Sequence, residues 1–139
     1  MYRNIACALD GSDGSRRALE VALHIARADK LKLWVIFIEE LPRYPGAPSE
    51  TNEERERADA IFGNLRHEAV EAGKKYGVEV IAEKRLGHPA QALVHYVKEA
   101  CIDLLVIGHT GHSKLWGTFM GTTADKVVRH ATSSVLVVR

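Results

Sequence analysis

The chain has 139 residues, of which 46% are hydrophobic, and its 19 Lys and Arg stand against 18 Asp and Glu. This length and apolar content fit one folded domain over residues 1–139 and exclude an intrinsically disordered chain. The near balance of charge argues against a dedicated nucleic-acid-binding protein, and no apolar stretch reaches the roughly 20 residues that a membrane span needs. We therefore expect neither nucleic acid nor membrane as a partner.

Apolar runs and helical stripes alternate along the first part of the chain. Residues 5–9 and 31–38 contain short apolar runs that predict strands. Between them, a helical stripe predicts a helix from Ser12 to Ala28, with Ser12 as its N-cap, because a serine hydroxyl can accept a hydrogen bond from a first-turn amide. Residues 41–52 hold three of the four prolines and predict an irregular loop.

A long helix is expected from Glu53 onward, beginning with a mixed-charge run that indicates a solvated face. Its apolar stripe, which we expect to face the core, consists of Ala58, Ile61, Phe62, Leu65, Ala69, Ala72 and Tyr76. Gly77 is placed to end the helix in the left-handed conformation that glycine tolerates. Residues 78–86 follow with a weaker, more polar strand pattern that is typical of a sheet edge.

The last third of the chain continues the alternation. Pro89 suits the first turn of a helix that we expect to reach about Cys101, with the cysteine turned inward. Residues 103–108 and 134–138 predict strands, and a last helix is expected between them over 122–131. Helices that alternate with strands apolar on both faces predict an α/β fold, an open five-stranded parallel sheet with helices on both faces.

The two cysteines, Cys7 and Cys101, follow no spacing typical of a metal site, a redox motif or a disulfide framework. Each lies in an apolar segment, so we expect both to behave as small core residues. The N-terminus runs directly into a strand without the layout of a signal peptide. These features predict a reducing, cytoplasmic location.

A glycine-rich segment between the 103–108 strand and the last helix carries the chemistry. Gly108, Gly111 and Gly121 leave backbone amides uncovered by side chains. Thr122 and Thr123 start the helix, whose first amides and dipole favour an anion. These parts predict a cradle for a polyphosphate; the alternative interpretation is an ordinary flexible loop.

Three titratable residues lie near this cradle in sequence or in the expected sheet. We expect His109 and His112 to flank the phosphates rather than hold a metal, because no carboxylate or cysteine completes a ligand set nearby. Asp10 directly follows the first strand, where its carboxylate can accept from a ribose hydroxyl or serve in the turn before the helix. If the first and fourth strands are neighbours, Asp10 and Gly108 face each other across one crevice.

The spacing Gly108-x2-Gly111-x9-Gly121-Thr122 resembles the Gly-x2-Gly-x9-Gly-Ser/Thr signature of the ATP-binding universal stress proteins. Asp10 and the last two predicted strands fall in matching places, so the resemblance covers essentially the whole chain. It implies a Rossmann-like fold of the adenine nucleotide alpha hydrolase-like type, with sheet order 3-2-1-4-5. It also implies bound ATP, with Mg²⁺ carried by the phosphates.

The resemblance assigns roles by position. Asp10 is expected to hold the ribose, Ala8 and Leu9 to line the base, and the backbone at Ile38 to meet the adenine edge. The complete expected nucleotide set is Ala8, Leu9, Asp10, Gly11, Ile38, Gly108, His109, Gly111, His112, Gly121, Thr122 and Thr123. The chain departs from the family pattern at His109, where a small residue such as Ser is common, and at Thr123, where Val is common.

The final strand suggests how the protein assembles. Val135 to Val138 carries no charge, and as a free sheet edge it would be an aggregation hazard, so we expect a homodimer through this strand, as is common in the family.

The leading hypothesis for function is a nucleotide-dependent regulatory stress-response protein, with an unidentified partner protein and at most slow ATP hydrolysis. An ATPase or nucleotidyl-transfer enzyme is the first alternative. The segment 10–15 lacks the Ser-Gly-Gly-x-Asp-Ser loop of adenylating relatives, and no pair of a general base and a water-positioning group is evident. A nucleotide-independent interaction module is the second alternative.

Overall fold

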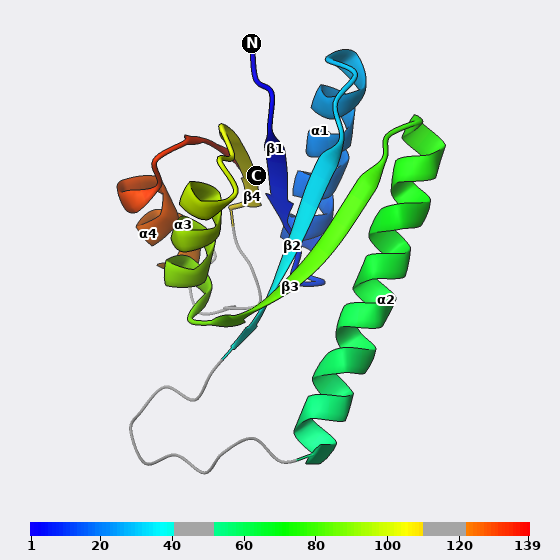
Figure 1. Ribbon diagram of the computed structural model, residues 1–139, viewed down its shortest axis with the longest axis vertical. Coiled ribbons are helices and arrows are strands. Elements are labelled where there is room, and N and C mark those ends of the chain that lie inside the picture. The colour runs from blue at the N-terminus through cyan, green and yellow to red at the C-terminus, as the bar shows by residue number, and fades with distance from the viewer. Residues whose placement is uncertain (41–51, 110–121) are drawn as a thin grey trace.

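The computed structural model describes residues 1–40, 52–109 and 122–139. Its elements in chain order are β1 (Ile5–Ala8), α1 (Asp13–Ala28), β2 (Leu33–Glu40), α2 (Asn52–Tyr76), β3 (Val80–Gly87), α3 (Pro89–Glu99), β4 (Leu104–Gly108), α4 (Thr122–His130) and β5 (Ser134–Val138) (Figure 1). Every predicted strand and helix is present, with ends that differ by one or two residues. The predicted loop at 41–52 lies outside the described residues, except for Asn52, which begins α2.

The five strands form one parallel sheet in the order β3-β2-β1-β4-β5, which confirms the expected fold class and order. β1 lies at the centre, and its first residue, Ile5, is in register with Leu33 of β2 on one side and Leu104 of β4 on the other. β3 forms one edge of the sheet, as its polar sequence predicted.

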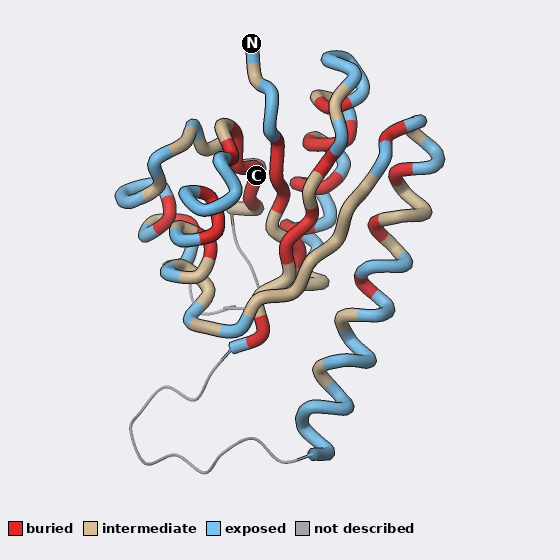
Figure 2. Tube along the Cα trace, viewed as in Figure 1, coloured by how far each residue is buried: buried red, intermediate tan, exposed pale blue. Residues whose placement is uncertain are grey.

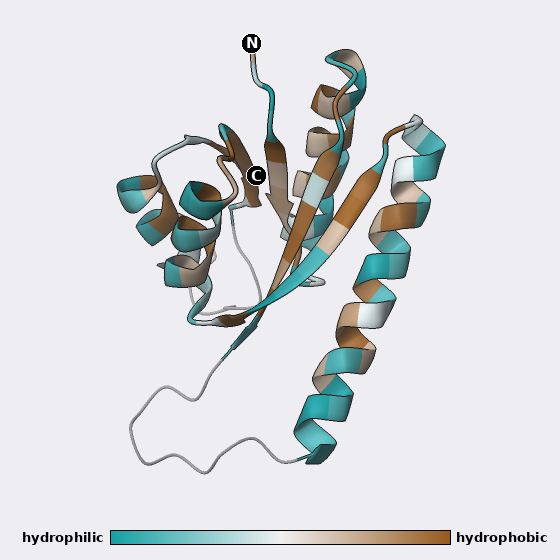
Figure 3. Ribbon diagram, viewed as in Figure 1, coloured by the Kyte–Doolittle hydropathy of each residue, from teal (hydrophilic) through white to brown (hydrophobic). Residues whose placement is uncertain are grey.

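The helices cover both faces of the sheet and bury two separate cores (Figure 1). Ile5 and Cys7 of β1 pack toward α1 and α2, whereas Ala6 between them packs toward α3 and α4. Figure 3 shows apolar residues along the central strands and a mixture of apolar and polar residues around α2. Alternate residues of each central strand therefore serve opposite cores, which is why these strands read as continuous apolar runs.

The start of α1 is fixed by the predicted cap. Ser12 has extended backbone dihedrals, and its hydroxyl oxygen accepts a hydrogen bond from the Ser15 amide at 3.2 Å. Asp13 adds a negative charge to the first turn, where the helix dipole favours it. The cap holds the turn after β1 in one conformation.

α2 extends beyond the sheet that it covers. Its C-terminal half buries Leu65, Ala69 and Gly73, whereas its N-terminal half is largely exposed (Figure 2). Ile61 was expected in the core but is 45% exposed. The left-handed backbone of Gly77 ends the helix, as predicted.

The prediction that Cys101 faces the core is wrong. α3 ends at Glu99, and Cys101 adopts a positive φ of 54° in the following turn, with its thiol exposed. The sequence pattern extended the helix too far by about one half-turn and therefore placed the side chain on the wrong side. Cys7, by contrast, is fully buried as expected, and both cysteines are free thiols.

Within the ranges that the structure describes, no helix has the combination of length and apolarity required to cross a membrane.

Two glycines of α2 provide a test of this packing. An added Cβ at Gly73 lies 2.5 Å from Val80 Cγ2 and 2.7 Å from the Val78 carbonyl oxygen, whereas one at Gly63 has no described atom within 4 Å. We expect Gly73→Ala to destabilise the protein by about 1–3 kcal/mol through overpacking. Gly63→Ala should stabilise it by about 0.5–1 kcal/mol, because alanine restricts the unfolded chain and favours the helix. Urea unfolding measures the free energy of unfolding of both variants. Changes of the same sign in the two variants would contradict this packing.

Candidate functional site

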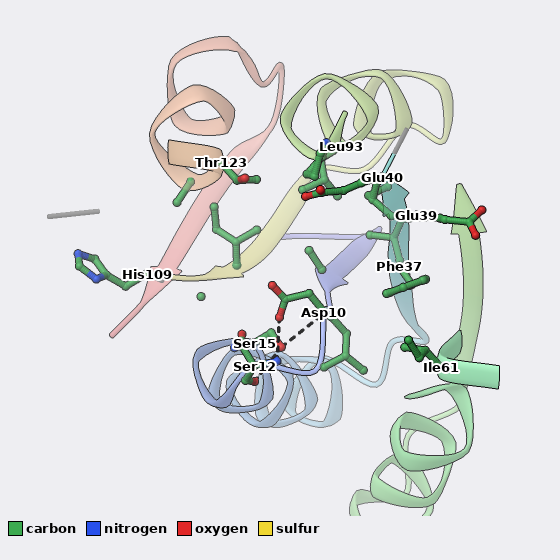
Figure 4. A pocket seen from close by; sticks show the side chains of 18 of the residues that line it. Asp10, Ser12, Ser15, Phe37, Glu39, Glu40, Ile61, Leu93, His109 and Thr123 are labelled. Atoms are coloured by element: carbon green, nitrogen blue, oxygen red, sulfur yellow. Dashed lines mark hydrogen bonds between the residues drawn. The ribbon is translucent and has the colours of Figure 1, made fainter. Parts of the chain in front are cut away.

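A cavity of about 450 Å³ opens at the carboxyl ends of β1, β2 and β4 (Figure 4). It is bounded on one side by α2, on another by the start of α3, and on a third by the first turn of α4. Parallel α/β sheets present their binding crevices at this position, where the strand order reverses. Of the predicted nucleotide set, the cavity lining includes Ala8, Leu9, Asp10, Ile38, Gly108, His109 and Thr123.

Asp10 is oriented by the turn that precedes α1. The Ser12 amide donates to Asp10 Oδ1 at 2.9 Å, and the Asp10 amide donates to Ser15 Oγ at 3.3 Å (Figure 4). Ser15 Oγ in turn donates to the Ser12 carbonyl at 2.9 Å. The turn role considered for Asp10 is thus observed, and the same geometry holds its carboxylate at the floor of the cavity.

Gly11 serves the turn instead of lining the cavity. Its φ of +87° lies in the left-handed region, and its carbonyl accepts a hydrogen bond from the Arg16 guanidinium. Arg16 also pairs with Glu68 of α2 at 2.6 Å, so this turn is tied to the helix beside it.

The packing of β4 against α1 by itself requires a glycine at position 108. A Cβ at this position would lie 2.7 Å from the Gly14 carbonyl carbon and 3.0 Å from the Ser15 amide nitrogen. The missing side chain therefore lets the first turn of α1 approach the end of β4. The next amide, that of His109, donates to the Val138 carbonyl at 2.7 Å and extends the pairing of β4 with β5.

The two ends of the cavity differ in chemistry. At the β2 end, the carboxylates of Glu39 and Glu40 lie beside walls that are otherwise apolar and include Ile36, Phe37, Ile38, Ala58, Ile61 and Leu93. At the β4 end, the lining consists of Gly108, His109 and the start of α4 at Thr123 and Ala124. The N-terminus of α4 brings the positive end of a helix dipole to this second end. A ligand with one flat apolar end and one anionic end matches this arrangement.

Carboxylates dominate the charge of the described lining. Asp10, Glu39 and Glu40 belong to it, and no Lys or Arg does among the residues described. Lys84 lies just outside, with its Nζ 3.9 Å from Glu39 Oε2. In the described ranges, no group of three or more His, Cys, Asp or Glu side chains is placed to hold a metal.

The thiol of Cys7 lies behind Asp10 and remains protonated. Burial raises the pKa of the Cys7 thiol, and the Asp10 carboxylate raises it further. A thiolate is the reactive form of cysteine, so Cys7 acts as packing for the cavity floor and not as a nucleophile.

Several predicted residues lie where the structure gives no side-chain description. Gly111, His112 and Gly121 lie outside the described residues, and of Thr122 only its place as the first residue of α4 is described. Their roles stay predictions.

The predicted nucleotide set did not include several other lining residues, among them Phe37, Glu39, Glu40, Ile61 and Leu93. Phe37 and Glu39 flank Ile38, so the end of that strand was a usable signal. Ile61 and Leu93 were both assigned to core stripes, and periodicity alone does not distinguish a core face from a cavity wall.

Known proteins match this sequence along its whole length. A family model described as the universal stress protein family matches residues 1–139. The universal stress protein MJ0531 of Methanocaldococcus jannaschii is 31% identical over 146 residues, which cover 100% of this chain and 83% of that protein.

Two solved structures share the fold. UspA from Lactobacillus plantarum aligns with a TM-score of 0.82 and 24% identity over 99% of this chain and 98% of its own. A universal stress protein solved in complex with cAMP aligns with a TM-score of 0.74 and 28% identity, covering 99% of this chain and 97% of its own. From the full-length family match and the identity to a curated relative, this chain belongs to the universal stress protein family.

Proposed function

We propose that this protein binds ATP with Mg²⁺ on its phosphates and acts as a nucleotide-dependent regulatory protein of the stress response. The observation that carries the proposal is the gradient of chemistry along the cavity, from apolar walls at β2 through Asp10 to the N-terminus of α4. The cAMP complex of a family member at 28% identity supports an adenine nucleotide as the ligand class.

Each part of a nucleotide matches one part of the cavity. The base fits the apolar end beside Ile38, where backbone groups at the end of β2 can read its edge. The ribose falls next to Asp10, which is already oriented by the Ser12 amide. The phosphates extend toward Gly108 and the first turn of α4, where a helix N-terminus favours negative charge.

The acidic lining supports a role for Mg²⁺. Asp10, Glu39 and Glu40 repel a triphosphate, and within the described ranges no lysine or arginine of the lining offsets them. A magnesium ion held mainly by phosphate oxygens and water reduces this repulsion and needs no dedicated cage of protein ligands. Residues of the 110–121 segment, including Gly111, His112 and Gly121, complete the phosphate site in this proposal.

We propose a regulatory function with at most slow hydrolysis, in the cytoplasm. The ring of His109 points away from Asp10 in Figure 4, so these two side chains do not form a pair that activates water. Nucleotide-dependent order at the cavity would change affinity for a partner protein.

The first experiment identifies the natural ligand. Freshly purified protein is denatured by heat, and the released small molecules are identified by mass spectrometry. The proposal expects ATP or its hydrolysis products; a protein that carries no nucleotide and gives no heat on titration with Mg·ATP is instead a nucleotide-independent module.

Gly121→Val tests the glycine cradle. A branched side chain at this position stands where the phosphates must approach, so we expect binding of Mg·ATP to be lost in isothermal titration calorimetry. The same variant serves as the background control in a turnover assay. Hydrolysis that persists in the variant comes from contamination, and an unchanged affinity for Mg·ATP removes the cradle from the proposal.

Asp10→Ala tests the ribose contact. Loss of the carboxylate should weaken ATP binding by about 1–3 kcal/mol, the typical effect of leaving a polar partner unmatched. Asp10→Asn keeps an oxygen acceptor for both the ribose and the Ser12 amide, so it should weaken ATP binding less than Asp10→Ala does. Calorimetry measures both affinities, and equal affinity in wild type and Asp10→Ala contradicts the assignment.

We also propose a homodimer through β5. Val135 to Val138 are only partly buried in the single chain, and β5 is an edge of the sheet. Covering this apolar edge with a second copy removes the unpaired strand. Light scattering at micromolar concentration should give the dimer mass, and Val137→Lys should shift it to monomer. A monomeric wild type overturns this assembly.

A further inference from the structure

The exposed side chain of Ile61 is best explained by the cavity. Ile61 lies one helical turn before Leu65, which is buried at 6% exposure against the sheet. Ile61 itself is 45% exposed and lines the cavity together with Ala58 (Figure 4). The apolar stripe of α2 therefore continues beyond the buried core and becomes a wall of the β2 end of the cavity. An apolar surface left open there gains free energy when a flat apolar group covers it.

A single lysine joins this wall to the sheet. Lys84 of β3 places its Nζ 2.6 Å from Asp59 Oδ1 on α2 and 3.9 Å from Glu39 Oε2 on β2. Its side chain is 25% exposed and that of Glu39 is 10% exposed, so this pair is partly shielded from water, whereas the Asp59 side chain is 67% exposed. Shielded pairs are stronger than those on an open surface. Asp59 is the residue after Ala58, so the lysine acts on the turn of α2 that lines the cavity.

An aromatic contact fixes the same turn from a second direction. Phe62 stacks on Phe37 with ring centroids 6.0 Å apart and an interplanar angle of 23°. Phe37 itself lines the cavity. The residues before this turn, from Asn52 to Arg57, are exposed, and the lysine and the stacked rings join the turn to the sheet. Segments with few buried contacts open at low free energy.

We propose that Lys84 is a positioning residue for the nucleobase. By holding Asp59 and Glu39, it fixes the turn of α2 that presents Ile61, and Ile61 supplies the apolar surface on which the base rests. This inference rests on the proposed nucleotide binding and assigns the α2 wall to recognition of the base. Lys84 and Ile61 have no role at the phosphate end of the cavity in this proposal.

The test combines ATP affinity with amide hydrogen exchange of α2, measured on the full chain. Lys84→Met should weaken ATP binding about tenfold and speed exchange over residues 53–62 relative to 65–76. Lys84→Arg keeps a cation for both carboxylates, so it should restore affinity and exchange to near wild type. Lys98→Met, which removes an exposed lysine on α3, should change neither.

Ile61→Ala separates contact from positioning. It should also weaken ATP binding about tenfold, as expected for loss of apolar contact in a binding pocket, but leave exchange over 53–62 unchanged. If Lys84→Met does not fold, Asp59→Asn replaces it as a surface variant, with an expected loss of about threefold in the same direction.

The outcomes distinguish this inference from the function on which it rests. A wild-type protein that binds no nucleotide overturns the proposed function and the inference with it. A wild type that binds ATP, with Lys84→Met or Ile61→Ala binding equally well, overturns the inference alone. Weaker binding in Lys84→Met without faster exchange in 53–62 overturns the positioning role.

Discussion

The parallel pairing of β1 with both β2 and β4 is the constraint on which the cavity depends. The chain builds outward from β1 to β3 on one side, then crosses back and builds β4 and β5 on the other. Because crossovers between parallel strands are right-handed, the reversal of direction places α1 and α2 on one face and α3 and α4 on the opposite face. The helices that follow β1 and β4 therefore lie on opposite faces of the sheet, and a crevice opens at the ends of these two strands. Any ligand site built from the ends of these strands follows from that arrangement.

Close packing at the crevice narrows the choice of residues there. α1 approaches β4 so closely that Gly108 has no room for a Cβ, and the same approach holds the Ser12 cap and the Asp10 carboxylate in place. One glycine thus satisfies both the packing of the fold and the shape of the site. Burial behind the turn keeps the Cys7 thiol protonated. The floor of the cavity therefore presents one oriented carboxylate, and the thiol near it is not a nucleophile.

The opposite wall is built differently. α2 is longer than the strands it covers, and its largely exposed first half carries Ile61 on the cavity wall. Ion pairs to Lys84 and the stacked Phe37 and Phe62 rings connect that half to the sheet edge. This wall is therefore held by side-chain contacts with β2 and β3, whereas the floor is held by backbone packing.

The sequence by itself determined the order and type of the elements, because helical and strand periodicities are local properties. It also marked Asp10 and Gly108 as site residues, since strand ends and glycines can be located without tertiary knowledge, and the family resemblance added Ile38. The structure brings these three together at one cavity. Only the tertiary structure decided which apolar helix faces pack against the sheet. A periodic stripe says that one face is apolar, but not whether that face packs in the core or lines a cavity, and so Ile61 was expected in the core yet lies on a cavity wall. The end of α3 depends in the same way on contacts distant in sequence, which turn Cys101 outward. The link from Asp59 through Lys84 to Glu39 joins three separate elements, and no local pattern could have predicted it.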